Sequence, residues 1–340
     1  MVRIAYCVFR LVVTQYAIRN TRSASCAYVA GNHFHRYGRA SARVACFSSH
    51  ALCSWCPFVV SYDIPFPSLP MPELPEVQTI LDALAPHVVG RTIMEVTLRW
   101  PRVVDRPDPA RFRAGIRGSR VEGVRRRGKY MLFQLDEARW LVMHLRMTGK
   151  VRVVPPDDPI RPHDRLIFHL DDGREWRFED QRKFGRVYLV EDPAEVVGKL
   201  GPEPLSEAFH AAYLSSILAH RTAAIKSLLL DQRIVAGIGN IYADEALFRA
   251  RIHPLRPGRD LSPDEIGRLV EAVKHVLTQA LAEMGTTLRD YRRPDGSVGS
   301  FQNSLQVFRR TGEPCPSCGA PIQRIVVGGR STHFCPDEQH

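Results

Sequence analysis

The sequence predicts an α+β protein with several domains. We expect a β-sandwich with a leading helix at residues 71–200, an all-helical domain at 201–290, and a closing zinc-type β-hairpin within 291–340. Three observations support this division. Short β-type runs separated by turn residues fill the first segment. A helical period of apolar residues begins after "GPEPL" (201–205). Paired cysteines mark the last segment.

Residues 1–70 do not share this organisation. They contain seven Arg, no Lys, no Glu and one Asp, which gives +6 of the net charge of +11. An Arg- and Ser-rich segment that is poor in acids is typical of a targeting peptide. However, no persuasive amphipathic helix is present, so we favour upstream sequence added by an early start assignment. We therefore leave residues 1–70 out of the fold prediction as an extension.

The overall composition favours an anionic partner. A net charge of +11 and a pI of about 9.5 indicate binding to a polyanion, most simply nucleic acid. The alternative is a basic surface without a specific partner. No run of 18 apolar residues occurs, so the sequence predicts no membrane span.

The predicted β-sandwich begins with an amphipathic helix over 76–89. Its apolar positions recur at helical spacing: Val77, Ile80, Leu81, Leu84 and Val88. Six β-type runs follow: "TIMEVTL", "KYMLFQL", "RWLVMHLRM", "RLIFHL", "REWRF" and "GRVYLV". The turn residues at 171–173 suit a hairpin between two of them. Several antiparallel strands at this spacing indicate a sandwich or barrel.

Four helices are predicted in the next domain. Three correspond to "SEAFHAAYLSSILAH", "TAAIKSLLLD" and "NIYADEALFRA". The fourth begins at a capping box of Ser262 and Glu265 and ends near Gly285. Its expected apolar stripe is Ile266, Leu269, Val270, Val273, Val276, Leu277, Leu281 and Met284.

The last segment has the cysteine spacing of a metal site. Cys315 and Cys318 lie three residues apart in "CPSCG", and Cys335 follows after β-type sequence. This layout predicts a zinc hairpin. A fourth ligand is expected near 338, where Glu338 stands, and His340 is able to supply a nitrogen instead. The alternative is three free thiols on a hairpin held by packing.

Two other stretches combine positive charge with turns or apolar side chains. Arg125, Arg126, Arg127 and Lys129 precede a strand, as in a solvated turn or a phosphate-neutralising cluster. In "HLRMTGK" and "DQRKFGR" a basic residue stands beside a large apolar one. Such pairs fit wedges that fill the gap left by an extruded base. The pattern alone favours core positions for Met147 and Phe184.

A glycine loop leads into the helix that starts at Asn240. In "VAGIGNIYADEAL", Gly237 and Gly239 precede that helix, and Lys226 lies on the preceding one. Backbone N–H groups at such a helix start bind phosphate. The two helices and the loop predict a unit similar to a helix–turn–helix.

Together these stretches resemble the formamidopyrimidine-DNA glycosylase family, the bacterial base-excision enzymes that remove oxidised purines. The resemblance runs in order through "PELPEV", "RRRGKY", "HLRMTG", "GPEPL", "AIK", "GIGNIYADEALF", "GTTL", "GEPCPSCGAPI" and "GGRSTHFC", and it covers 71–340. It implies an N-terminal β-sandwich, a helix-two-turn-helix domain and a zinc hairpin. It also implies a bacterial cytoplasmic, nucleoid-associated monomer that binds double-stranded damaged DNA and one Zn²⁺; organelle targeting by residues 1–70 is the minor alternative.

The resemblance implies a bifunctional glycosylase and abasic-site lyase. In this family the N-terminal proline amine, here Pro72, attacks C1′ of the damaged nucleotide and forms a Schiff base. Glu73 matches the general acid/base, Lys129 the lysine of β-elimination, and Arg330 the hairpin-tip arginine assigned to phosphate binding and δ-elimination. With residues 1–70 attached, the Pro72 nitrogen would be an amide, so we expect the active chain to begin at Pro72.

The remaining implied roles concern DNA. The DNA-contact positions are His163, Arg182, Arg221, Lys226 and Asn240, and the void-filling positions are Met147, Arg182 and Phe184. The sequence departs from the family at Glu338, at Lys183 and in the extension. The alternatives are an endonuclease VIII-like enzyme for oxidised pyrimidines and a non-catalytic DNA-binding zinc protein. "PELPEV" and "TLRDYRRPDGSVGSFQ", which suits a loop over a flipped base, favour the purine enzyme.

Overall fold

The computed structural model describes residues 26–28, 44–46, 71–286 and 299–340. The chain divides into two compact units, Met1–Ser68 and Leu69–His340. In the first, β1 (Cys26–Tyr28) pairs antiparallel with β2 (Val44–Cys46). Every element described below belongs to the second unit.

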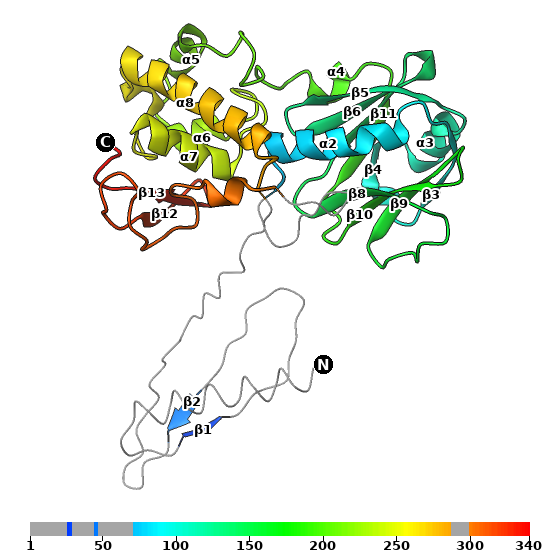
Figure 1. Cartoon of the computed structure of the whole chain (residues 1–340), viewed down its shortest axis with the longest axis horizontal. Coiled ribbons are helices and arrows are strands. Elements are labelled where there is room, and N and C mark those ends of the chain that lie inside the picture. The colour runs from blue at the N-terminus through cyan, green and yellow to red at the C-terminus, as the bar shows by residue number, and fades with distance from the viewer. Residues whose placement is uncertain (1–25, 29–43, 47–70, 287–298) are drawn as a thin grey trace. The chain divides into compact units, whose positions relative to one another are not determined.

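The predicted sandwich is confirmed and consists of two sheets (Figure 1). The four-stranded sheet has the order β3 (Ile93–Leu98), β9 (Asp164–Leu170), β10 (Glu175–Asp180), β8 (Gly149–Val154). The five-stranded sheet has the order β4 (Val104–Arg106), β11 (Arg186–Val190), β7 (Trp140–His144), β6 (Tyr130–Leu135), β5 (Val121–Arg127). The turn at 171–173 closes the β9–β10 hairpin, as predicted.

The leading helix α2 (Leu74–Val88) contributes to the sandwich core. All five apolar positions expected to face inward are buried. They join side chains of both sheets and of α3 (Pro109–Ile116) in one cluster. Shorter helical elements of this part are η1 (Pro101–Val103), η2 (Asp136–Ala138) and α4 (Ala194–Val197). Neither α3 nor strands β4, β5 and β8 were expected from the sequence.

The helical part comprises α5 (Ala211–Leu218), α6 (Ile225–Leu229), α7 (Asn240–Ala250), η3 (Gly258–Asp260) and α8 (Pro263–Ala282). The predicted capping box of α8 is confirmed, because Ser262 and Glu265 exchange both side-chain-to-backbone bonds. The last two expected stripe positions are wrong. Leu281 is only half-buried, and Met284, at φ +61°, lies beyond the helix end at Ala282 and is 45% exposed.

The C-terminal module follows η4 (Phe301–Asn303). Strands β12 (Gln323–Val327) and β13 (Arg330–Phe334) form the predicted antiparallel hairpin. Most of the expected loop over the flipped base, 287–298, lies outside the described residues. None of the helices in the described ranges has the length and apolar character that crossing a bilayer requires.

Candidate active site and nucleic-acid interface

The site is centred on the carboxylate of Glu73, the N-cap residue of α2. Its Oε1 accepts the N–H of Ile241 at 2.9 Å and its Oε2 that of Tyr242 at 3.5 Å, both in the first turn of α7. A Cβ at Gly239 would overlap this carboxyl group. The glycine loop therefore admits Glu73 to the helix N-terminus. The expectation that these N–H groups serve phosphate is wrong, because Glu73 occupies them.

The surroundings of Glu73 bring the pKa of its carboxyl group close to neutral pH. Burial raises the pKa of this carboxyl group to about 7, and the neighbouring Glu76 raises it too. The positive charge of Lys129 and the two N–H groups of α7 act in the opposite direction. A buried carboxyl with a pKa near the working pH is suited to general acid/base chemistry.

Lys129 brings the second predicted catalytic group to the same place. It follows Gly128 in the turn between β5 and β6 and is buried. Burial lowers the pKa of its ammonium group, Glu73 counters that effect, and Arg330 and Arg146 lower the pKa further. Glu73, Lys129 and Arg330 therefore form one electrostatically coupled site, although they come from three distant parts of the sequence.

Pro72 lies next to this site. It is buried and directly precedes Glu73. The N–H of Leu74 donates to the carbonyl of Gly237 at 3.0 Å, which ties the start of α2 to the glycine loop. In the 340-residue chain the Pro72 nitrogen is an amide to Met71. The geometry thus brings a potential N-terminal amine beside a buried acid, but only a chain starting at Pro72 would carry that amine.

Glu76 is a further buried residue of the site that the sequence analysis did not select. Its Oε2 accepts the N–H of Glu73 at 3.0 Å. Its Oε1 accepts the hydroxyl of Tyr242 at 2.6 Å and both the N–H and Oγ1 of Thr286, at 2.8 and 3.0 Å. The carboxylate therefore joins the start of α2, helix α7 and the chain that follows α8. The capping-box pattern of Glu73 and Glu76 was the available signal.

The structure gives Lys226 a different role from the predicted DNA contact. Its ammonium group is fully buried and pairs with Asp244 of α7 at 2.6 Å. It also donates to the carbonyl of Ser331 and to Oγ1 of Thr332, at 3.1 and 2.7 Å. Because these partners surround the ammonium, it holds strand β13 on the helices and is not available to phosphate.

Two further contacts attach β13 to α7. Asp244 accepts the backbone N–H of His333 at 2.9 Å and lies 3.1 Å from its Nδ1. Asn240, also a predicted DNA contact, donates from Nδ2 to the carbonyl of Ser331 at 2.8 Å. These bonds fix the strand that begins with the exposed Arg330.

The arginine cluster at 125–127 is largely structural. Arg126 pairs with Glu203 at 2.6 Å, and Arg127 pairs with it at 3.0 Å. Arg125 stacks over the ring of Trp140, 4.2 Å from its centroid. The solvated turn expected for Arg126 and Arg127 is wrong, because Glu203 in the segment after the sandwich binds both guanidinium groups.

The three predicted void-filling residues lie together. Nη1 of Arg182 contacts Sδ of Met147 at 3.2 Å, and its guanidinium lies 4.8 Å from the ring centroid of Phe184. Phe184 is 46% exposed. The core positions that the pattern alone favoured are wrong, because Met147 is only half-buried and Phe184 is exposed beside the cation of Arg182.

The other predicted DNA contacts are more scattered. His163 is half-buried, and its Nδ1 lies 3.1 Å from Nη2 of Arg165. Arg221 is exposed in the loop between α5 and α6. His144 was not predicted: it is buried, its Nδ1 accepts the N–H of Arg146 at 2.9 Å, and burial and the nearby Arg146 hold its pKa well below the usual range.

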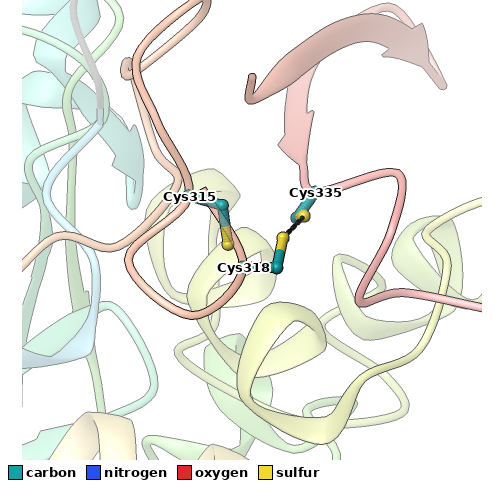
Figure 2. A group of neighbouring side chains, drawn as sticks. All are labelled: Cys315, Cys318 and Cys335. Atoms are coloured by element: carbon teal, nitrogen blue, oxygen red, sulfur yellow. Dashed lines mark hydrogen bonds between the residues drawn. The ribbon is translucent and has the colours of Figure 1, made fainter. Parts of the chain in front are cut away.

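The predicted metal cluster is confirmed in its three cysteines. The Sγ atoms of Cys315, Cys318 and Cys335 lie within 4.8 Å of one another (Figure 2). The first two come from the turn before β12, and Cys335 follows β13. Backbone N–H groups point to the thiols of Cys315 and Cys335. Three thiolates with such support suit Zn²⁺.

The structure does not bring His340 into this cluster, so the expected Cys₃His set is not formed. Its imidazole is exposed, and its carbonyl accepts from the N–H of His253 and from Nη1 of Arg256, both at 3.0 Å. Glu338 pairs with Arg251 at 3.4 Å. The backbone of the C-terminal residue, and not its side chain, has the structural role.

Family models match three consecutive parts of the chain. The formamidopyrimidine-DNA glycosylase N-terminal domain matches 71–187, its H2TH domain matches 200–292, and the zinc finger found in FPG and IleRS matches 312–337. The chain belongs to the formamidopyrimidine-DNA glycosylase family. This family has the β-sandwich, H2TH domain and zinc finger that the sequence predicted.

Individual relatives match this chain over most or all of their own length. The formamidopyrimidine-DNA glycosylase of Symbiobacterium thermophilum is 49% identical over 270 residues, which is 78% of this chain and 88% of the relative. That of Roseiflexus sp. is 48% identical over 79% of this chain and 100% of its own. The crystal structure of the MutM (Fpg) protein from Thermus thermophilus superposes with a TM-score of 0.72 at 46% identity, covering 79% of this chain and 98% of that one.

Relatives bound to DNA are also similar. The Lactococcus lactis Fpg in complex with DNA containing an abasic site has a TM-score of 0.74 at 37% identity, covering 79% of this chain and 99% of that one. A variant of the same enzyme in complex with Fapy-dG DNA has a TM-score of 0.75 at 38% identity, covering 79% and 100%. These relatives are members of the family seen in complex with damaged DNA.

Proposed function

We propose that this chain, in a form that begins at Pro72, excises oxidised purines from double-stranded DNA and then cleaves the abasic strand by β,δ-elimination. The chain is a DNA glycosylase of the formamidopyrimidine type with a zinc finger. Beyond this family assignment, we propose the identity of the lesion, the lyase steps and the roles of individual residues. Action on the chromosome within the bacterial nucleoid follows from it.

The observation that carries the proposal is the burial of Glu73 at the start of α7, beside Lys129. A carboxyl with a pKa of about 7 exists in both protonation states at neutral pH. It can therefore donate a proton to the sugar ring oxygen or the leaving base, and later accept one. Directly before it in the chain, a Pro72 amine with a pKa near 8 would be partly unprotonated and nucleophilic.

The elimination steps are assigned to the two cations. Lys129 has its pKa lowered by burial, so its neutral form is more accessible than that of an exposed lysine. It is the candidate base for β-elimination once the Schiff base has formed. Arg330, exposed at the start of β13, is the candidate phosphate contact and participant in δ-elimination.

The DNA-facing assignments rest on exposure. The exposed Arg182 and Phe184 and the half-buried Met147 form a cluster of two apolar side chains and a cation, which suits insertion into the gap left by a flipped nucleotide. Arg221 and His163 are retained as backbone contacts, and Asn240 is proposed as a contact that also braces β13. Lys226 is not among these contacts, because its ammonium group is buried against Asp244.

A zinc ion would be held by Cys315, Cys318 and Cys335, and it would supply structural support for the hairpin. The helix contacts of Lys226, Asp244 and Asn240 hold β13 from the other side. Arg330 is thus supported by two separate sets of bonds.

A single-turnover assay of base release tests the proposal. Chain starting at Pro72 is mixed with duplex DNA containing 8-oxoguanine, and the Glu73→Gln variant serves as comparison. Gln keeps an oxygen that can accept the N–H of Ile241 but cannot donate the acid proton, so we expect base release to fall at least about 100-fold while DNA affinity changes little. Base release at the wild-type rate by Glu73→Gln would overturn the assignment.

A second candidate substrate class is oxidised pyrimidines. A Lactococcus lactis Fpg has been crystallised with DNA containing an oxidised pyrimidine, and it is 38% identical to this chain over 79% of it, with a TM-score of 0.74. The same assay with both lesions separates the candidates, since the purine enzyme should release 8-oxoguanine faster. A protein that binds both DNAs and releases neither base would be the non-catalytic alternative.

A further inference from the structure

The cysteine module contains two turns of the same kind. In the first, the thiol of Cys315 accepts backbone N–H groups of Ser317 and Cys318. In the second, the thiol of Cys335 accepts backbone N–H groups of Asp337 and Glu338. Three residues after its first cysteine, the first turn carries the thiol of Cys318. The corresponding position of the second turn carries Glu338. Its side chain therefore occupies the position at which a fourth ligand is expected.

The second turn is held firmly in this register. Gln339 is buried, and its Oε1 accepts the N–H of Cys335 at 2.9 Å. Its Nε2 donates to the carbonyl of Ile252 at 2.9 Å, in the loop after α7. Because Gln339 is fixed on both sides, the turn cannot slide by two residues to place His340 where Glu338 stands.

The contacts of the two candidate ligands also differ in kind. His340 is anchored through its backbone and its imidazole is exposed, and neither this imidazole nor the Glu338 carboxylate lies within the thiol cluster. Glu338 uses its side chain: its carboxylate, 18% exposed, lies 3.4 Å from Nε of Arg251. The side chain of Arg251 is 70% exposed, and an ion pair to so exposed a partner is weak. A bond from the carboxylate to Zn²⁺ can therefore replace it.

We propose that Glu338, and not His340, supplies the fourth ligand to zinc, which gives this chain a Cys₃Glu centre. Carboxylate oxygen is an accepted Zn²⁺ ligand, although thiolate and imidazole ligands dominate structural zinc sites. Three thiolates and one carboxylate carry the same total charge as four thiolates. In the described structure the carboxylate rests on Arg251, so a side-chain rotation accompanies metal binding, and Arg251 remains beside the anionic centre.

Zinc affinity of the full 340-residue chain tests this proposal directly. The apo protein is titrated with Zn²⁺ in competition with a chromophoric chelator, for the unchanged chain and for Glu338→Ala, Glu338→Cys and His340→Ala. We expect Glu338→Ala to weaken zinc binding at least about tenfold, since it removes a ligand. Glu338→Cys should strengthen binding, because it restores a fourth thiolate, and His340→Ala should leave the affinity unchanged.

Cobalt(II) provides a second readout that does not depend on stability. The thiolate-to-cobalt absorption of Glu338→Cys should exceed that of the unchanged chain by about one third, the ratio of four thiolates to three. Unchanged zinc affinity in Glu338→Ala would overturn the proposal and leave solvent as the fourth ligand. Loss of zinc in His340→Ala would overturn it in favour of His340.

Discussion

At the scale of single residues, the site depends on opposing charges in a small buried volume. Glu73 and Glu76 are both buried carboxyl groups, and Lys129 lies beside them. The desolvation of Glu73 raises its pKa, Lys129 lowers it, and Glu76 raises it. Removing the charge of Lys129 should therefore raise the pKa of Glu73, and removing the charge of Glu76 should lower it.

The pH profile of base release should follow this balance. The chain starting at Pro72 should lose activity as the pH rises through about 7, because Glu73 then loses the proton that it donates. Glu76→Gln removes a negative charge, so it should lower the pKa of Glu73 and move this alkaline limb to lower pH. Lys129→Met removes a positive charge and should move the limb to higher pH. Single-turnover rates across the neutral range measure both shifts.

A matched control for these variants is Glu122→Gln, which changes an exposed carboxyl on β5. It should leave the alkaline limb in place. Shifts of Glu76→Gln and Lys129→Met in the same direction would contradict the assignment of the limb to Glu73. A profile that does not move in either variant would place the titrating group elsewhere.

At the scale of elements, strand β13 is held on α6 and α7 by buried charge. Lys226 and Asp244 are both fully buried, and removing one partner of such a pair leaves the other charge uncompensated. The strand that they hold begins with Arg330. Lys226 should thus affect DNA binding through the position of the hairpin and not through a phosphate contact.

The salt dependence of DNA affinity distinguishes these two roles. Arg330→Ala should lower the slope of log K against log salt by about 0.9, the loss of one phosphate contact. Lys226→Met should weaken DNA binding and leave the slope unchanged. Fluorescence anisotropy with an abasic-site duplex at several salt concentrations measures both. A reduced slope in Lys226→Met would return this lysine to the phosphate contacts.

The sequence predicted elements well where local signals were complete. Helix α8 has a capping box and a regular apolar stripe, and its start was placed correctly. Strand β5, "VEGVRRR", was missed because three arginines ended its apolar pattern, yet Arg126 and Arg127 have a partner in Glu203. Strand β8 was also missed. Its buried Arg152 pairs with Asp164, and periodicity cannot indicate such a contact.

At the scale of the whole second unit, three segments among its described residues, 71–286 and 299–340, meet at the start of α2. Glu73 reaches α7, while Glu76 reaches both α7 and Thr286 after α8. Glycines make this approach feasible: Gly239 faces Glu73, and a Cβ at Gly285 would lie 2.8 Å from Oε1 of Glu76. The position of the proposed acid is therefore set by the helical part as well as by the sandwich.

A substitution at this junction should affect chemistry more than binding. Gly239→Ala places a methyl group into the Glu73 carboxyl, so we expect base release to fall at least about tenfold as the acid is displaced. The matched control is Gly267→Ala in α8, where a Cβ meets nothing within 4 Å. It should leave activity unchanged and stabilise the helix by up to about 1 kcal/mol. Equal activity of Gly239→Ala and Gly267→Ala would contradict this account.

Less of the site than of the fold was predictable from the residues alone. The family resemblance indicated Pro72, Glu73, Lys129 and Arg330, and the structure places the last three in one coupled site. The bond between Glu73 and Ile241 spans 168 residues and leaves no trace in local pattern. The family resemblance assigned Lys226 to DNA, and only its buried contact with Asp244 reveals its structural role, because lysines are rarely fully buried without a partner.

The central claim is that a free Pro72 amine attacks the damaged nucleotide, and borohydride trapping tests it most directly. A Schiff base between an amine and the sugar is reduced by borohydride to a stable covalent adduct. Chain starting at Pro72 and the full 340-residue chain are each incubated with abasic-site DNA and borohydride under the same conditions. We expect the chain starting at Pro72 to form the adduct and the full chain to form none, since its Pro72 nitrogen is an amide. Equal trapping of both forms would contradict the account and place the nucleophile on another residue.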